Sequence, residues 1–505
     1  MLRSKPITGK LKELQQTIEA YAIEHGLDFF PQIFEICDYE TINILAAQGG
    51  FPSRYPHWKF GMDYDQLSKN YAYGLQRIYE MVINTNPCYA YLLEANNWVD
   101  QKLVMAHVYG HNDFFKNNAW FANTDRRMMD QMANHGSKIR RFMEKYGQDR
   151  VELFIDQVLS LENLLDVNHL FETSEVKRSR TDQHEIYEKE KGMNLDSDKG
   201  ASDALRSFLK SKQKDELKKA NANTAPKDPN QILKTHNSLK KPMRDVLYFL
   251  IEYAPLEEWE ADIIGILREE AYYFLPQRMT KIMNEGWASY WHSRIMTERA
   301  ADASEIIDFA DKHAGVMVMS KQNINPYKIG IELFRDIEFR WNTGRFGKEY
   351  NECEDMHAKA NWDKKTMLGR DKIFEVRKSH NDISFIDEFL TQEFCLRQQI
   401  FTYKYNPKTQ RHEIETRDFL AIKQKLLSQL TNFGQPIIEV VDDNFHNRSE
   451  LLLFHKHYGV DLDLKYASET LNNLYKIWKR PVNIQTQYED QKVTFRFDGK
   501  EFKQL

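Results

Sequence analysis

Two long blocks with a helical pattern of apolar residues, separated by a highly charged segment, limit what this chain of 505 residues can fold into. In residues 11–25, apolar side chains recur at steps of three and four, and similar patterns fill most of residues 1–171 and 243–432. Such a period buries one face of each helix against other helices. The sequence therefore predicts a mainly α-helical fold with an N-terminal and a second helical half.

The segment 172–242 between the halves contains few large apolar residues and many charges. Because it cannot bury enough apolar surface to offset the entropy lost on ordering, we expect an exposed insert. Within the second half, Pro255 and Pro276 each predict a helix boundary or kink. Residues 433–505 differ, because short apolar or alternating segments surround one helical stretch, 467–481. We expect a small α+β module there.

Charge and cysteine content exclude several classes of protein. The 70 Lys and Arg residues against 75 Asp and Glu give a net charge of −5, which provides no general positive field for nucleic acid or an anionic membrane. The four cysteines form no Cys-x-x-Cys pair, so neither a disulfide framework nor a thiolate zinc ribbon is expected. No apolar run is long enough for a signal core or a membrane span. We expect a cytoplasmic protein with no nucleic-acid partner.

The sharpest chemical feature is a pair of histidines, His107 and His111, inside the helical pattern LVMAHVYGHNDFF. Side chains four residues apart project from one face of a helix, so both imidazoles can reach one metal ion, although such pairs are common on long helices. Gly110 weakens the helix by about 1 kcal/mol relative to Ala, which makes sense where another element approaches closely. In H-E-x-x-H metallopeptidases the catalytic Glu follows the first His, and this chain has Val108 there.

A second polar group lies in residues 268–292, REEAYYFLPQRMTKIMNEGWASYWH. Glu285 precedes Gly286 on a helix that can pack tightly against another, which suits a third metal ligand. His292 lies on nearly the same face but about 10 Å further along the axis, so we expect it to contact substrate or a ligand. Glu270 is the expected general acid or base. The alternative is that these residues only form the packed seam of a helical bundle.

Five stretches closely resemble the SpoVR family, named for stage V sporulation protein R. The resemblance spans nearly the whole chain and implies a cytoplasmic bacterial protein linked to the spore cortex, a peptidoglycan layer. Because members also occur in bacteria that do not sporulate, it implies more broadly a role in cell-envelope or stress physiology. The stretches are FPSRYPHWKFG (51–61), YEMVINTNPCYAYL (79–92), MAHVYGHNDFFKNN (105–118), REEAYYFLPQRMTKIMNEGWASYWH (268–292) and NPYKIGIELFRDIE (325–338).

The order of a His-x-x-x-His helix and a later Glu-Gly-Trp-Ala is also similar to helical zinc peptidases of the gluzincin type, where that Glu is the third ligand. This similarity implies a zincin-like bundle with zinc or another divalent metal at His107, His111 and Glu285. The departure at Val108 puts ordinary peptide hydrolysis in question and leaves metal binding intact.

Two functions from different classes remain. The first is a metal-dependent enzyme acting on an amide or isopeptide bond of a peptidoglycan-related peptide or precursor. Glu270 would then be the general acid or base, and Tyr109 or His292 would stabilise an oxyanion. The second is a non-catalytic assembly or regulatory factor of envelope biogenesis or the stress response, in which the same polar residues hold the helical core together.

Overall fold

The computed structural model describes most of the chain: residues 3–72, 80–171, 239, 241–318 and 325–505. Two compact units divide these residues, unit 1 with residues 1–165 and 250–437, and unit 2 with residues 166–249 and 438–505. The expected insert, 172–242, lies almost entirely outside the described residues. Each unit is described by itself.

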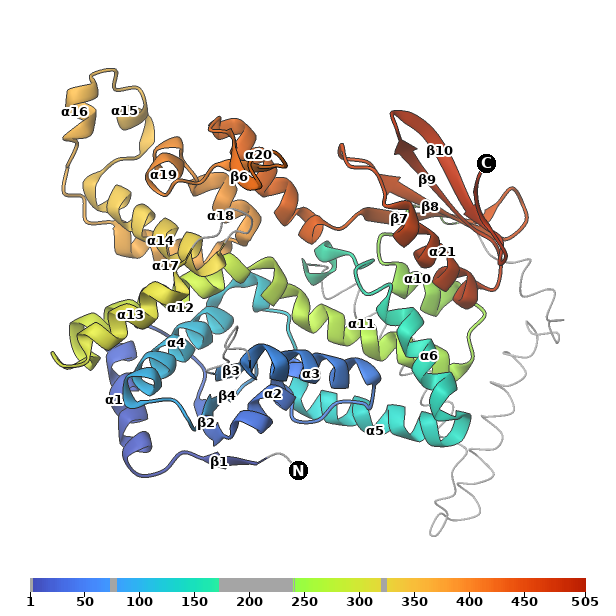
Figure 1. Cartoon of the computed structure of the whole chain (residues 1–505), viewed down its shortest axis with the longest axis horizontal. Coiled ribbons are helices and arrows are strands. Elements are labelled where there is room, and N and C mark those ends of the chain that lie inside the picture. Colours follow the sequence, from blue (N-terminus) through green and yellow to red (C-terminus); the bar gives the residue numbers. More distant parts are fainter. Residues whose placement is uncertain (1–2, 73–79, 172–238, 240, 319–324) are drawn as a thin grey trace, which may run out of the picture. The chain divides into compact units, whose positions relative to one another are not determined.

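Unit 1 is mainly helical, as the apolar pattern predicts (Figure 1). Its longer helices are α1 (Lys10–Glu24), α2 (Tyr39–Ala47), α3 (Trp58–Ala72), α4 (Trp98–Asn117), α5 (Met128–Tyr146), α6 (Gln148–Leu159), α11 (Glu258–Met279), α12 (Lys281–Ile295), α13 (Ile306–Val316), α14 (Pro326–Thr343), α17 (Gly369–Ser379), α18 (Asp382–Phe389) and α20 (Phe419–Leu430). Shorter elements are α15 (Gly347–Asn351), α16 (Met356–Ala360), α19 (Gln392–Arg397) and the hairpin of β5 (Thr402–Asn406) and β6 (Arg411–Thr416).

The prediction of a helical N-terminal half missed a four-stranded sheet that this half contains beside its helices. Its order is β1-β2-β4-β3, with β2 and β4 parallel and both outer pairs antiparallel. Strands β2, β3 and β4 are only four to six residues long, and apolar segments this short fit a buried strand as well as part of a helix. The strands are β1 (Ser4–Pro6), β2 (Gln32–Cys37), β3 (Glu80–Ile83) and β4 (Cys88–Leu93).

A helix ends before Pro255, as predicted, whereas the helix break expected near Pro276 lies four residues later. Helix α10 (Val246–Tyr253) ends before Pro255, whereas α11 runs through Pro276 to Met279. A proline removes only its own backbone donor, and the Pro276 carbonyl still accepts hydrogen bonds from the backbone N–H and the hydroxyl of Thr280. The chain therefore bends at Thr280, four residues later, and α12 follows at once.

Very close helix crossings hold α12 between α4 and α14 (Figure 1). A Cβ added to Gly110 on α4 would lie 2.7 Å from Cα of Ala288, and one added to Gly286 would lie 2.4 Å from the backbone of Gly330 on α14. Both distances are shorter than carbon atoms tolerate, so only glycine allows these crossings. The prediction that another element approaches Gly110 and that the Glu285 helix packs tightly is confirmed.

Two buried acidic side chains fix the direction of α12 and its position along the helix axis. Asp382, at the start of α18, accepts hydrogen bonds from the backbone N–H groups of Ile282 and Met283, 2.9 Å each. Burial raises the pKa of Asp382 to about 7 despite these bonds. Asp113 on α4 accepts hydrogen bonds from Nε1 of Trp287, at 2.7 Å, and from Arg377, at 2.6 Å. These contacts set the register between α4 and α12.

Unit 2 contains the predicted C-terminal α+β module. A five-stranded sheet of order β11-β10-β9-β8-β7 packs against the amphipathic helix α21 (Leu464–Trp478), which buries Leu471, Leu474 and Ile477. The expected short strands on both sides of a helical stretch are present, and the sheet has five strands in all. The strands are β7 (Ile437–Phe445), β8 (Glu450–Lys456), β9 (Val482–Tyr488), β10 (Gln491–Phe497) and β11 (Phe502–Gln504).

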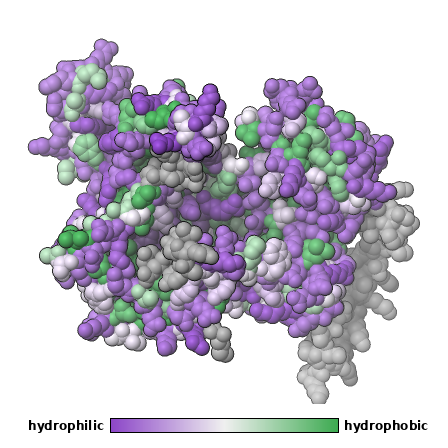
Figure 2. Space-filling view, viewed as in Figure 1, coloured by the Kyte–Doolittle hydropathy of each residue, from purple (hydrophilic) through white to green (hydrophobic). Residues whose placement is uncertain are grey.

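Two properties of the described residues concern membrane association: the length and apolar content of the helices, and the hydropathy of the surface. None of the described helices combines the length and the apolar content that crossing a bilayer requires. On the face drawn in Figure 2, hydrophilic side chains predominate and hydrophobic ones are scattered among them. Single apolar residues on a surface are ordinary and mark no docking face.

Candidate metal centre

Three potential ligands meet where α4 crosses α12. Nε2 of His107 lies 3.6 Å and Nε2 of His111 lies 3.5 Å from Oε2 of Glu285. The ligand atoms of all three side chains lie within 4.8 Å of one another. The two imidazole planes are nearly perpendicular, at 87°, with centroids 4.5 Å apart. The structure thus brings together the three residues that the sequence names as ligands, and we refer to His107, His111 and Glu285 as the metal centre.

The spacing in the metal centre fits a divalent ion. Bonds of about 2.0–2.2 Å at tetrahedral angles place neighbouring ligand atoms about 3.3–3.6 Å apart, which matches the two distances to Glu285. Within the described residues, Oε2 of Glu285 is buried and has no hydrogen-bond partner. A buried carboxylate oxygen is costly unless a cation or donor compensates it. The donor set of two imidazoles and one carboxylate therefore fits a bound cation.

Neighbouring side chains hold both imidazoles with Nε2 toward Glu285. Oδ1 of Asn284 lies 2.9 Å from Nδ1 of His111, and Nδ1 of His292 lies 2.9 Å from Nδ1 of His107. A metal-binding histidine usually engages its other ring nitrogen in this way, which fixes the ring and its tautomer. Asn284 was not singled out from the sequence, although it directly precedes Glu285.

The charge states of these groups suit metal ligation. Burial lowers the pKa of His111 to about 4, and the neighbouring His107 adds to that effect. Burial alone would raise the pKa of Glu285, but its contacts with His107 and His111 outweigh it and the pKa is lowered. At neutral pH His111 is therefore neutral and Glu285 is ionised, which are the forms that coordinate a cation.

Two further side chains face the metal centre and were missed by sequence reasoning. Glu80, the first residue of β3, lies close enough to His107 and Glu285 for their charges to shift its pKa, which burial and the Glu285 charge raise. Tyr327, at the start of α14, lies close enough to Glu285 for its charge to act on the phenol, and burial and that charge raise the pKa of Tyr327. Its ring stacks on His107, with centroids 6.2 Å apart. Both lie in stretches that resemble the SpoVR family, 79–92 and 325–338, but no spacing within those stretches indicates a role for either residue at this site.

His292 lies beside the metal centre but is not one of its ligands. Its Nδ1 contacts His107, and its Nε2 lies 3.1 Å from Nδ1 of His313 on α13. The expectation of a contact with a ligand matches this position. Because both ring nitrogens are engaged, the structure gives His292 no free donor for an oxyanion.

The structure places the other two predicted catalytic residues elsewhere. The hydroxyl of Tyr109 accepts a hydrogen bond from Gln15 and donates one to Glu19, on α1. Tyr109 lies two residues from each histidine, so its side chain leaves the opposite face of α4. Glu270 pairs with Arg54 and His135, and none of the contacts that the structure gives it reaches the metal centre.

Glu270 belongs to a second buried group that we call the arginine cluster, Arg54, His135 and Glu270. Oε2 of Glu270 accepts a hydrogen bond from Arg54 at 2.5 Å, and its Oε1 lies 3.1 Å from Nδ1 of His135. Nε2 of His135 lies 3.4 Å from Glu269. Each oxygen of the Glu270 carboxylate thus has its own cationic or hydrogen-bonding partner.

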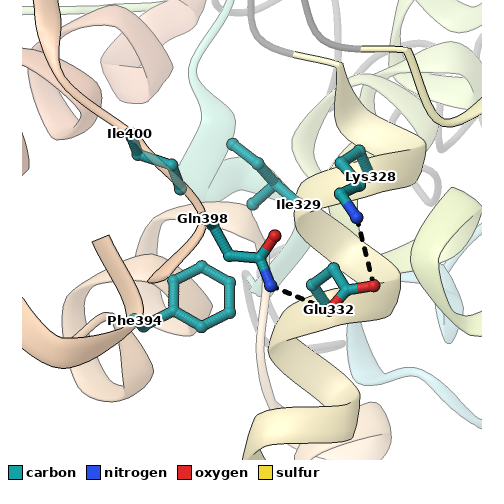
Figure 3. A pocket seen from close by; sticks show the side chains of 6 residues that line it. All are labelled: Lys328, Ile329, Glu332, Phe394, Gln398 and Ile400. Atoms are coloured by element: carbon teal, nitrogen blue, oxygen red, sulfur yellow. Dashed lines mark hydrogen bonds and ion pairs between the residues drawn. The ribbon is translucent and has the colours of Figure 1, made fainter. Parts of the chain in front are cut away.

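A small cavity lies further along α14, between that helix and α19 (Figure 3). There, Lys328 and Gln398 both donate hydrogen bonds to Glu332, at 3.3 and 2.9 Å. The cavity measures about 10 Å³, which is room for about one water molecule. It is too small for an organic substrate, so it marks a packing defect beside the elements that carry the metal centre.

Comparison with known proteins places the chain in a family. A family model described as "SpoVR like protein" matches residues 7–435. The chain belongs to the SpoVR-like family. A second model, "SpoVR-like C-terminal domain", matches residues 436–489, so the junction of the two SpoVR-like models coincides with the division between units near residue 437. The metal centre and the arginine cluster both lie within the first match.

Among relatives, an "Uncharacterized protein YcgB" of Escherichia coli (strain K12) is 30% identical over 502 residues. The match covers 94% of this chain and 91% of that protein. No solved structure matches the chain. The comparisons thus extend over both units and assign a family.

Proposed function

We propose that the chain is a metal-dependent hydrolase whose single divalent cation, zinc or a similar ion, binds at the metal centre. One observation carries the proposal: two histidine Nε2 atoms and a buried, otherwise unpartnered carboxylate oxygen meet at ligand spacing. Two histidines and one Glu, with a further position open, form the donor set of hydrolytic zinc sites. When bound, such a cation supplies a Lewis acid and lowers the pKa of water.

In this proposal Glu80 is the base that Val108 does not provide. Val108 is fully buried and apolar, whereas Glu80, on strand β3, lies close enough to His107 and Glu285 for their charges to act on its carboxyl group. The raised pKa of its carboxyl group suits a residue that accepts a proton from water and returns it to a leaving amine. The ring of Tyr327 stacks on His107, which helps to keep that ligand in place.

The proposed substrate is an amide or isopeptide bond in a peptidoglycan-related peptide or precursor. The donor set supports the reaction class, because hydrolytic zinc sites of this composition act on amide carbonyls. The proposed substrate class rests on the family. The family name refers to sporulation, and the resemblance of this chain to the family implies a link to the peptidoglycan of the spore cortex. It is the part of the proposal that depends most on that resemblance.

The test is amine release from a mixture of peptidoglycan stem peptides by the untagged full chain loaded with Zn²⁺ or Mn²⁺. We expect amines to accumulate with the parent protein and not with the double variant His107→Ala/His111→Ala. His380→Leu is the matched control, since His380 pairs with Glu388 and has no contact with the metal centre. It should keep the parent rate.

The rival function is a non-catalytic assembly or regulatory factor of envelope biogenesis or the stress response. A parent protein that binds the cation tightly but releases no amine would overturn the hydrolase and favour this rival, with the ion as a structural element. Equal rates for the parent and the double variant would instead show that any amine release comes from another site or a contaminant.

A further inference from the structure

Three histidine rings form a continuous line that starts at the metal centre. Nδ1 of His107 on α4 contacts Nδ1 of His292 on α12 at 2.9 Å, and Nε2 of His292 contacts Nδ1 of His313 on α13 at 3.1 Å. His107 and His292 are buried, with 5% and 3% of their surface exposed, and His313 is half-buried. The line of rings therefore connects His107, a residue of the metal centre on α4, through His292 on α12 to His313 on α13.

Hydrogen-bond chemistry links the tautomers of the three rings. A neutral imidazole carries one N–H and one lone pair, and each nitrogen-to-nitrogen contact needs one of each. For His107 to offer the Nε2 lone pair to a cation, its proton must sit on Nδ1. His292 must then accept at Nδ1 and donate from Nε2, and His313 must accept at Nδ1 and keep its proton on Nε2. Only this direction leaves His107 ready to bind.

The opposite direction satisfies the same contacts but blocks the metal centre. If His313 donates from Nδ1 and His292 donates from Nδ1, His107 accepts at Nδ1 and carries its proton on Nε2. That proton would point at Glu285 and occupy the lone pair that a cation needs. The lone pair on Nδ1 of His313 is therefore what separates a binding arrangement from a blocked one.

The surroundings of His313 hold its ring and keep it neutral. Its ring stacks on Phe309, one turn earlier on α13, with centroids 5.6 Å apart, and meets the ring of His292 at 88°. Burial and the positive charges of Arg335 and Lys328 on α14 lower the pKa of His313 to about 4. A neutral His313 retains one lone pair, which a protonated ring would lack.

We propose that His313 is a positioning residue of the metal centre: through His292 it keeps His107 in the tautomer whose Nε2 lone pair faces Glu285. The inference rests on the proposed metal centre and assigns a residue outside the SpoVR-like resemblance motifs. His313 touches neither the cation position nor Glu285 in the contacts that the structure gives it. It acts on the affinity of the metal centre through the two rings between.

The test is Co²⁺ titration of the metal-free full chain, followed by the visible absorption of bound Co²⁺. His313→Leu removes the acceptor, and we expect about 10–100-fold weaker binding and an altered spectrum, as for other partners of metal-binding histidines. His313→Asn keeps an acceptor at a similar position and should restore parent-like affinity. His380→Leu should leave affinity and spectrum unchanged. Circular dichroism checks that each variant is folded.

Parent-like affinity and spectrum in a folded His313→Leu would overturn this inference and leave the metal centre standing. A parent chain that binds no Co²⁺ would overturn both. Should His313→Leu not fold, the histidine tautomers of the Zn²⁺-loaded parent decide, measured by ¹H–¹⁵N correlation after selective histidine labelling. We expect His292 and His313 to carry their protons on Nε2, and a His292 proton on Nδ1 would contradict the proposal.

Discussion

The metal centre and the arginine cluster are made of the same kinds of residue and differ in what compensates their carboxylate. In the arginine cluster Glu270 has Arg54 on one oxygen and His135 on the other. In the metal centre Oε2 of Glu285 is buried without a hydrogen bond, and the nearest donors are two histidines at 3.5 and 3.6 Å. The arginine cluster thus contains a cationic side chain, Arg54, that compensates its carboxylate, whereas the ligand spacing of the metal centre fits a bound cation.

The histidines of the two groups carry opposite charge states because different numbers of carboxylates oppose the effect of burial. Burial alone would lower the pKa of His135, but its hydrogen bonds to Glu269 and Glu270 and their charges raise it to about 9. In the metal centre, burial and His107 lower the pKa of His111 to about 4 against the single charge of Glu285. A neutral imidazole is a metal ligand and a protonated one is not. The comparison therefore separates a structural His–Glu group from one prepared to bind an ion.

The largest effect is expected from Glu270→Gln, which removes the charge that compensates Arg54. Taking one partner from a buried ion pair leaves the other charge uncompensated and costs about 3–5 kcal/mol of unfolding free energy. Urea unfolding followed by tryptophan fluorescence measures the loss. Co²⁺ affinity of the folded fraction should stay at the parent value. Unchanged stability would mean that the arginine cluster is not an ion pair that the fold needs.

The matched change in the metal centre is Glu285→Gln. It should lower the Co²⁺ affinity and leave the stability of the metal-free protein nearly unchanged, which is the reverse of Glu270→Gln. It removes a ligand, so we expect Co²⁺ affinity to fall by more than about 100-fold, beyond the effect of losing a residue that only supports a ligand. The metal-free protein should keep its stability within about 1 kcal/mol, because the lost carboxylate oxygen had no hydrogen bond. If Glu285→Gln strongly destabilises the protein and leaves the Co²⁺ affinity unchanged, Glu285 has a structural role like that of Glu270, and the proposed difference between the metal centre and the arginine cluster is wrong.

A smaller effect is expected from Asn284→Leu, which removes the partner of Nδ1 of His111. The ring then loses its fixed tautomer, and metal affinity should fall about 10–100-fold. Competition with a chromogenic chelator measures it. Asn361→Leu, at the exposed end of α16, is the control and should bind like the parent. If both variants bind equally well, Asn284 does not orient the ligand.

The smallest effect is the contribution of His135, in the arginine cluster, to the pH dependence of stability. The pKa of His135 is about 9 in the folded chain and about 6.5 when unfolded, so its contribution is fully present below about pH 6.5 and is lost as pH rises through 9. After solvent screening we expect about 1–2 kcal/mol of stability lost between about pH 6 and 9.5 in the parent. His135→Gln should flatten that slope. Urea unfolding at each pH measures the unfolding free energies of the parent and of His135→Gln. If both change with pH by the same amount, His135 is not protonated in the folded chain.

The sequence predicts the helical character of unit 1 and the α+β character of the C-terminal module, because long amphipathic periods and alternating strands are local patterns. It missed the N-terminal sheet, whose strands are runs such as QIFEIC and CYAYLL. These pair in parallel across more than fifty residues, and nothing local encodes that pairing. Pro276 misled for a related reason, since tertiary packing holds a helix that its own propensity would end.

For the metal centre, the sequence predicts the ligands better than their surroundings. The four-residue spacing of two histidines and the small residues beside Glu285 have a direct geometric meaning. Glu80, Tyr327 and His313 have no such spacing and are recognised only when β3, α13 and α14 are folded around α4. Glu270 was chosen for its neighbourhood in sequence, yet its carboxylate pairs with Arg54.

The most direct test of the metal centre is the metal content of the untagged full chain by inductively coupled plasma mass spectrometry after equilibration with Zn²⁺ and gel filtration. We predict one zinc per chain for the parent and for Glu270→Gln, and none for His107→Ala/His111→Ala or Glu285→Gln. A parent without bound zinc or another divalent ion, or a double variant that retains one ion per chain, would contradict the assignment of His107, His111 and Glu285.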